Sequence, residues 1–283
     1  MSQTRPDVAL SDLPRLKAPP GACDTHMHFY DARYPTARTA VLTPPDASVE
    51  EYRAVQRRVG LSRTVVVQPT TYGTDNRCTL EGIAALGLEV ARGIAVVTDA
   101  TTEGELEELT ARGMRGARFH MLRGGAIPWG ELDRIAAKVQ GVGWHVQLQL
   151  DGRELPDREA QVRAWPGTIV IDHIGKFLEP VPVDHPAFLS LARLVESGRV
   201  WVKLSAMYEV SKAGRPLYED VGRLAKALIR IAPERMLWAS NWPHPGHAPQ
   251  DEAVLLDTLL DWAPDEATRR RILVDNPAEL YGF

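Results

Sequence analysis

The sequence predicts an α/β protein: a single barrel of eight parallel strands that alternate with helices. Eight short runs rich in β-branched and other apolar residues recur along the chain, and longer amphipathic runs lie between them. Strands that are apolar on both faces are typical of a parallel sheet covered on both sides. No glycine-rich phosphate turn follows the first run, which disfavours an open, doubly wound sheet. A length of 283 residues is normal for one (β/α)₈ TIM barrel.

The elements follow in chain order. Residues 1–20 are polar and contain several prolines, so they predict a short N-terminal tail before a barrel domain over 21–283. Apolar, β-branched runs predict strands at 22–28, 64–68, 93–97, 117–121, 144–150, 168–173, 200–205 and 236–241. Amphipathic runs predict helices at 48–59, 102–112, 132–140, 187–197 and 218–231. Ser48 with Glu51 matches a capping box that starts a helix, and so does Thr102 with Glu105.

The composition and net charge of the chain argue against nucleic acid and membranes as binding partners. The chain is 44% apolar and 25% charged, as in globular proteins, and its formal net charge is −4. Such a charge predicts no large cationic surface and therefore no nucleic-acid partner. No signal peptide or bilayer-length apolar run is seen, so we expect a cytoplasmic protein that binds no membrane. Two cysteines, Cys23 and Cys78, are too few for a disulfide framework, and the oligomeric state is left open.

Polar side chains gather where the predicted strands end, and a barrel of this kind carries its chemistry there. His26 and His28 are two residues apart, a spacing that points both side chains to one face of a strand. His173 ends the sixth predicted strand, and Asn241 ends the eighth. A single buried histidine is usually a hydrogen-bonded core residue, but several at one barrel end favour a functional site. We therefore predict a catalytic group of His26, His28, His173 and Asn241.

Three segments near strand ends carry a family resemblance: Asp24-Thr25-His26-Met27-His28, Ile171-Asp172-His173-Ile174-Gly175-Lys176 and Ser240-Asn241-Trp242-Pro243-His244. In this order they resemble the amidohydrolase superfamily, in the lactone-processing branch of D-galactarolactone isomerases and 2-pyrone-4,6-dicarboxylate hydrolases. The likeness runs from about residue 14 to residue 281. It implies a (β/α)₈ barrel and an enzyme that hydrolyses or isomerises lactones.

The resemblance also bears on metal binding. A metal-dependent member is expected to have a Lys, Glu or His ligand from the middle strands and an Asp where this chain has Asn241. An amide is no base near neutral pH. We therefore predict that no cofactor is required. If zinc binds at all, His26, His28 and His173 would hold it, as an adventitious ion.

The predicted substrate contacts are Gln68, Thr71, Tyr72, Asn76, Arg118, Arg123, Gln149, Lys203, Ser205, Tyr208 and His244. An arginine fork binds a carboxylate through two hydrogen bonds, so Arg118 and Arg123 predict a carboxylated small molecule. Hydroxyl and amide groups suit the rest of such a ligand. Two alternatives stay open: Arg123 as a solvated loop charge, and Lys203 as a structural ion pair with Asp172.

The leading hypothesis is a metal-independent enzyme that isomerises or hydrolyses a carboxylated sugar-acid lactone. Without a carboxylate at Asn241, either a histidine (His173, His28 or His244) activates water, or a hydroxyl of the substrate attacks the lactone. The runner-up is a 2-pyrone-4,6-dicarboxylate hydrolase-like lactonase, which the two arginines favour and Asn241 disfavours. A metal-dependent decarboxylase and a barrel that binds a sugar acid without turnover are alternatives of other classes.

Overall fold

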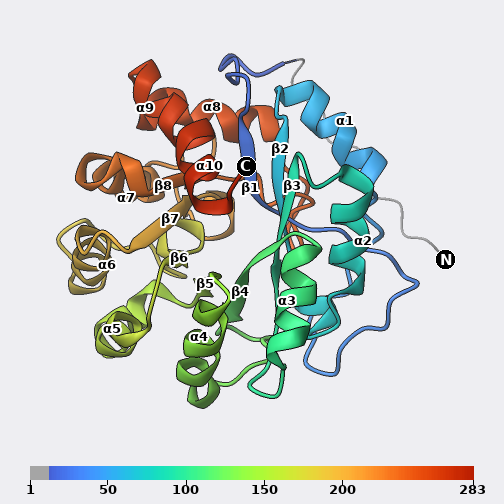
Figure 1. Cartoon of the computed structure of the whole chain (residues 1–283). Coiled ribbons are helices and arrows are strands. Elements are labelled where there is room, and N and C mark those ends of the chain that lie inside the picture. The colour runs from blue at the N-terminus through green and yellow to red at the C-terminus, as the bar shows by residue number, and fades with distance from the viewer. Residues whose placement is uncertain (1–12) are drawn as a thin grey trace.

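The computed structural model describes residues 13–283 and confirms the predicted (β/α)₈ barrel (Figure 1). Each strand pairs in parallel with the next in the chain, and the helices surround the strands. The strands are β1 Cys23–Met27, β2 Arg63–Val67, β3 Ala91–Ala95, β4 Met114–His120, β5 His145–Gln149, β6 Ile169–Ile171, β7 Val200–Leu204 and β8 Met236–Trp238. Most of the predicted N-terminal tail, residues 1–12, lies outside the described residues.

The helices are α1 Val49–Val59, α2 Arg77–Leu86, α3 Glu103–Ala111, α4 Leu132–Gly141, α5 Leu155–Ala164, α6 Pro186–Glu196, α7 Glu219–Ile231, α8 Glu252–Trp262, α9 Glu266–Arg270 and α10 Asn276–Tyr281. All five predicted helices are present, and both predicted capping boxes form. The predicted set does not include α2, α5, α8, α9 and α10. In α5 only Leu155 and Val162 are buried, which leaves almost no periodic signal. Within residues 13–283 no helix is long and apolar enough to cross a membrane.

All eight strands end one to three residues before their predicted ends, and in two of them the difference changes where a predicted site residue lies. The strands predicted at 168–173 and 236–241 stop at Ile171 and Trp238. The backbone then enters the left-handed region, with φ of 57° at His173 and 60° at Asn241. A strand cannot continue through such residues, so the chain turns sharply there. These turns place both side chains at the barrel mouth rather than along a strand.

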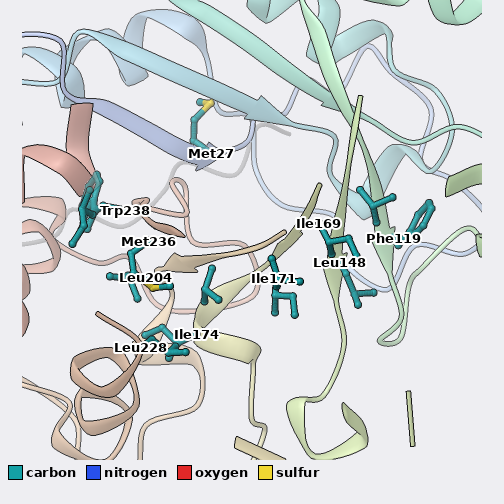
Figure 2. Close-up of a cluster of buried hydrophobic side chains, with 14 of the residues drawn as sticks. Met27, Phe119, Leu148, Ile169, Ile171, Ile174, Leu204, Leu228, Met236 and Trp238 are labelled. Carbon is teal, nitrogen blue, oxygen red and sulfur yellow. The ribbon is translucent and has the colours of Figure 1, made fainter. Parts of the chain in front are cut away.

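Buried apolar side chains fill the space between the strands and the helices. Figure 2 shows Met27, Phe119, Leu148 and Trp238 from four strands in one cluster. Alternate strand residues point the other way and form a second cluster with Tyr281 of α10; its strand members are Cys23, Val65, Val67, Ile94, Val170, Trp201 and Leu237. Both cysteines are buried and free, in agreement with the sequence prediction.

The seam between the first and last strands is closed by one buried carboxylate. Asp24 Oδ1 accepts hydrogen bonds from the backbone N–H groups of His26 (3.1 Å) and Ser240 (3.0 Å). Asp24 Oδ2 accepts from the hydroxyls of Tyr52 (3.0 Å) and Ser240. Just beyond β8, the N–H of Asn241 donates to the carbonyl of His26 at 2.8 Å. The two ends of the sheet are therefore joined at the level where the polar residues gather.

Ser240→Ala should lower the free energy of unfolding by about 1–3 kcal/mol, because it removes the hydroxyl that donates to the buried Asp24 carboxylate and accepts from the N–H of Trp242. Urea denaturation followed by circular dichroism measures this change. Ser62→Ala, at an exposed serine, is the matched control and should stay within about 0.5 kcal/mol of the parent chain. Equal stability of the two variants would show that the seam does not depend on Ser240.

Candidate active site

A cavity of about 350 Å³ opens at the C-terminal ends of the strands. Its lining is His28, Tyr30, Val41, Leu42, Pro69, Thr70, Arg118, His120, Leu122, Arg123, Gln149, His173, Lys176, Leu178, Glu209, Asn241, Pro245 and His247. Apart from the histidines, three of these described residues have basic side chains, Arg118, Arg123 and Lys176, and Glu209 is the one carboxylate. The cavity is therefore built to receive an anionic small molecule.

Arg118 is fixed in the cavity wall by its neighbours. Its Nη1 donates to the carbonyl of Gln68 at 2.8 Å, and its Nη2 donates to Gln149 Oε1 at 3.0 Å. Its Nε is buried and has no partner among the described residues. Burial lowers the pKa of this guanidinium, although the charge of Asp172 opposes that shift. An anion bound in the cavity would restore the lost solvation, so Arg118 suits a carboxylate.

A buried ion pair lies beneath the cavity. Lys203 Nζ donates to the carbonyl of Thr25 (2.7 Å) and to Gln147 Oε1 (2.6 Å), and lies 3.7 Å from Asp172 Oδ1. Gln147 Nε2 in turn donates to Asp172 Oδ2 at 3.1 Å. Burial lowers the pKa of Lys203 to about 8, against the raising effect of Asp172. The structure therefore gives Lys203 the structural ion pair that the sequence left open, and does not place it in the cavity lining.

Three histidines stand above this pair, as predicted. The ring centroid of His26 lies 4.9 Å from that of His28 and 4.7 Å from that of His173. His28 Nδ1 is 2.7 Å from the carbonyl of Val67, and since a carbonyl only accepts, Nδ1 carries the proton and Nε2 carries a lone pair. Burial, with help from the charge of Arg118, lowers the pKa of His28 to about 3. Burial also holds the pKa values of His26 and His173 well below the usual range.

The donor set for a metal differs from the predicted one. His26, Asp172 and His173 each offer one ligand atom, and these atoms lie within 4.8 Å of one another, whereas His28 falls outside this group. The Lys203 ammonium lies 3.4 Å from His26 Nδ1 and 3.7 Å from Asp172 Oδ1. A lysine charge already balances the one carboxylate, so a dication would meet strong repulsion. These residues do not fit a resident zinc ion.

Four predicted substrate contacts are occupied by loop carbonyl groups: Gln68, Thr71, Tyr72 and Asn76. Gln68 Nε2, for example, donates to the carbonyls of Gly73 and Asp75 at 3.1 and 2.8 Å. None of the four is among the described residues that line the cavity. They shape the loop after β2, which presents Pro69 and Thr70 to the cavity.

The loops after β7 and β8 meet in a chain of hydrogen bonds. Asn241 Nδ2 donates to Glu209 Oε1 and to Tyr208 Oη, both at 2.8 Å. The Tyr208 hydroxyl is 2.9 Å from His244 Nδ1, and His244 Nε2 is 3.1 Å from Glu252 Oε1. Because Glu252 accepts from Nε2–H, Nδ1 accepts from the tyrosine. Tyr208 and His244 are thus absent from the lining and support Asn241 from behind.

Ser205 also plays a supporting part, since its hydroxyl lies 2.8 Å from His173 Nδ1. The polar lining residues absent from the sequence prediction are Tyr30, Thr70, His120, Lys176, Glu209 and His247, and two of them, Lys176 and Glu209, are charged. Lys176 belongs to a motif that was noticed but not assigned, and Glu209 directly follows the predicted Tyr208. Their side chains form an ion pair across the cavity wall. A search for carboxylates in the loops after predicted strands could have found Glu209.

Residues 23–283 match the model of the amidohydrolase family. This chain belongs to that family. The amidohydrolase is 36% identical over 274 residues to D-galactarolactone isomerase of Agrobacterium fabrum, which covers 95% of this chain and 93% of the relative. It is 34% identical over 283 residues to 2-pyrone-4,6-dicarboxylate hydrolase of Comamonas testosteroni, with 95% and 92% covered. A solved apo structure from Agrobacterium tumefaciens superposes with a TM-score of 0.89 at 35% identity, covering 95% of this chain and 98% of that one.

The depressed histidine pKa values predict acid sensitivity of the amidohydrolase. An unfolded histidine binds a proton below about pH 6.5, whereas buried His145, whose pKa burial lowers to about 3, does not. The unfolded state therefore binds more protons, and stability falls as the pH drops from 7 to 5. His145→Gln, far from the cavity at the start of β5, should remove about 1–2 kcal/mol of that loss.

Urea denaturation at pH 7, 6 and 5 measures this dependence. His145→Leu is the matched variant, because it also removes the titrating ring but packs differently. Both variants should flatten the pH profile to the same extent even where their stabilities at pH 7 differ. If the stability of both variants falls with pH as steeply as that of the parent chain, His145 does not contribute to the acid sensitivity.

Proposed function

We propose that this amidohydrolase isomerises a carboxylated sugar-acid lactone, moving the acyl group from one substrate hydroxyl to another without a resident metal. The observation that carries the proposal is Asn241, an amide at the cavity wall that donates both of its hydrogens to Glu209 and Tyr208. It cannot accept a proton from water. The identity of 36% with a D-galactarolactone isomerase supports the same reaction.

The substrate's carboxylate would bind between Arg118 and Arg123, which both line the cavity. Arg118 is held rigidly by Gln149 and a main-chain carbonyl, so little conformational entropy is lost when an anion binds. A cavity of about 350 Å³ matches a small, polar ligand of this kind.

The ring of the lactone would lie over His28 and His173. The lone pair on His28 Nε2 would accept a hydrogen bond from a substrate hydroxyl, and His173 would contact the lactone carbonyl. His26 would support them from below, next to Asp172. Holding the attacking hydroxyl beside the carbonyl can remove roughly 7–11 kcal/mol from the barrier in favourable cases, so such a site needs no activated water.

The charge balance beneath the cavity supports a reaction without a resident metal. Lys203 supplies the positive charge that a metal would otherwise bring beside Asp172. A metal-dependent decarboxylase is disfavoured for the same reason. Hydrolysis is the second candidate, favoured by Arg123 in the lining and by the 34% identity with a 2-pyrone-4,6-dicarboxylate hydrolase.

Proton NMR of chelator-treated protein with D-galactarolactone and 2-pyrone-4,6-dicarboxylate tests the proposal. We expect a second lactone ring form to build up without open acid, at a rate that zinc does not raise. Open acid as the first product would make the chain a hydrolase. Activity that returns only with added zinc would refute metal-independence. Binding without any product would leave a non-catalytic sugar-acid barrel.

Arg118→Lys should weaken carboxylated lactones selectively, because a lysine keeps the charge but loses the planar fork. The loss of one charge-assisted hydrogen bond is about 1.5–3 kcal/mol, which corresponds to a rise of about 10- to 100-fold in KM. Initial rates with a carboxylated lactone and an uncharged lactone, compared for parent and variant, measure the effect. An equal loss for both substrates would remove Arg118 from the carboxylate site.

A further inference from the structure

The proposed reaction needs groups that move a proton between two oxygens of the substrate. His28 Nδ1 lies 2.7 Å from the carbonyl of Val67, and His173 Nδ1 lies 2.8 Å from the Ser205 hydroxyl, so one nitrogen of each ring is already engaged by the protein. A carboxylate and an ammonium, Glu209 and Lys176, also line the cavity and contact each other there.

Glu209 is the one carboxylate among the described lining residues, and its side chain is 9% exposed. Its Oε1 accepts a hydrogen bond from Asn241 Nδ2 at 2.8 Å. Its Oε2 forms an ion pair with Lys176 and lies 3.9 Å from His247 Nε2. An aspartate at position 241 would place a second negative charge against Glu209. The amide of Asn241 is thus the residue that lets a carboxylate stand at position 209.

Lys176 reaches Glu209 through an unusual backbone. His173, Ile174 and Lys176 have φ values of 57°, 57° and 48°. Left-handed conformations at residues other than glycine cost of order 1–3 kcal/mol each and gather at functional sites. Here they turn the chain after β6 so that the Lys176 side chain, 8% exposed, meets the loop after β7. The left-handed backbone is locally unfavourable, and it brings an ammonium and a carboxylate together at the cavity.

We propose that Glu209 and Lys176 are the proton-transfer pair of this site: Glu209 is the general base for the attacking hydroxyl, and Lys176 is the general acid for the leaving ring oxygen. This inference rests on the proposed lactone isomerisation. Both side chains contact the cavity from adjacent loops, so a substrate held by Arg118 can reach both of them.

The proton balance closes within the pair. The substrate hydroxyl oxygen bonds to the lactone carbonyl carbon while its proton passes to a Glu209 oxygen. The tetrahedral intermediate then expels the ring oxygen, which takes a proton from the Lys176 ammonium. Finally the Glu209 carboxylic acid returns a proton to the neutral Lys176 amine across their ion pair. No water, metal or redox partner is consumed.

The electrostatic setting suits these roles. Burial lowers the pKa of Lys176 to about 7, and Arg118 adds to this effect while Asp172 opposes it. An acid with a pKa near the working pH donates efficiently and is easily reprotonated. His247, from the loop after β8, also faces Glu209, with its Nε2 3.9 Å from Glu209 Oε2, and burial lowers the pKa of His247 as well.

Glu209→Gln tests the base directly, because the amide oxygen can still accept from Asn241. We expect kcat for ring isomerisation of D-galactarolactone to fall about 100-fold or more, and the acid limb of the pH–rate profile to disappear. Citrate, an inert polycarboxylate probe, should bind within threefold of the parent Kd by calorimetry. Glu179→Gln, at an exposed carboxylate paired with Lys212, is the matched control and should leave kcat unchanged.

Lys176→Met should lower kcat and remove the alkaline limb instead. The double variant should be no slower than the slower single variant, because the two groups act as one unit. If Glu209→Gln does not fold, Glu209→Asp replaces it; it should keep part of kcat together with the acid limb.

The outcomes separate this inference from the proposed function. A parent chain that converts no lactone refutes the function itself. A parent chain that isomerises, with Glu209→Gln retaining more than a third of kcat or keeping both limbs of the profile, overturns the assignment of Glu209 alone. Multiplicative losses in the double variant would show that Lys176 acts independently of Glu209.

Discussion

The structure depends on one buried carboxylate that holds the barrel shut. Asp24 bonds to backbone and side-chain donors of β1, α1 and the segment after β8, and all of these donors are buried. Each bond to a charged acceptor is stronger than a neutral one, and these bonds oppose the cost of burying the charge, although burial still raises the pKa of Asp24. Because this seam lies directly under the cavity, His26 of β1, His28 just after it and Asn241 are fixed relative to one another by the same group.

Above that seam the charged side chains form two layers, one buried beneath the cavity and one facing it. Lys203 and Asp172 neutralise each other in the interior, while Arg118, Arg123, Lys176 and Glu209 meet the cavity. Burial, with help from the charge of Lys203 at His26 and His28, holds the pKa values of the imidazoles low. The charged groups that face the cavity are available to contact an anionic ligand. This barrel has an amide rather than a carboxylate at position 241. The acidic and basic groups that face its cavity include Lys176 and Glu209, which lie on the loops after β6 and β7.

Strand-end residues were predictable from the sequence because the carboxyl ends of parallel strands meet at one face of a barrel. His28, His173, Arg118, Gln149 and Asn241 all line the cavity for that reason.

Loop residues were harder to predict. Gln68 and Asn76 were predicted to contact a ligand. In the structure their amide groups donate to main-chain carbonyl groups instead, and the loop geometry, which the sequence pattern does not reveal, determines this. The Lys176–Glu209 pair depends on three left-handed residues that no periodicity reveals.

The contrast between the cavity and the whole molecule affects how ligands arrive. The chain carries a formal charge of −4, whereas three basic side chains face one acidic side chain in the cavity. At physiological salt the screening length is about 8 Å, so an approaching anion is little affected by the distant negative surface and is attracted once it nears the mouth. The entrance therefore favours the association of anions over that of neutral molecules, whatever their shape. Capture should slow as ionic strength rises, while neutral lactones of the same size enter at a rate that salt leaves unchanged.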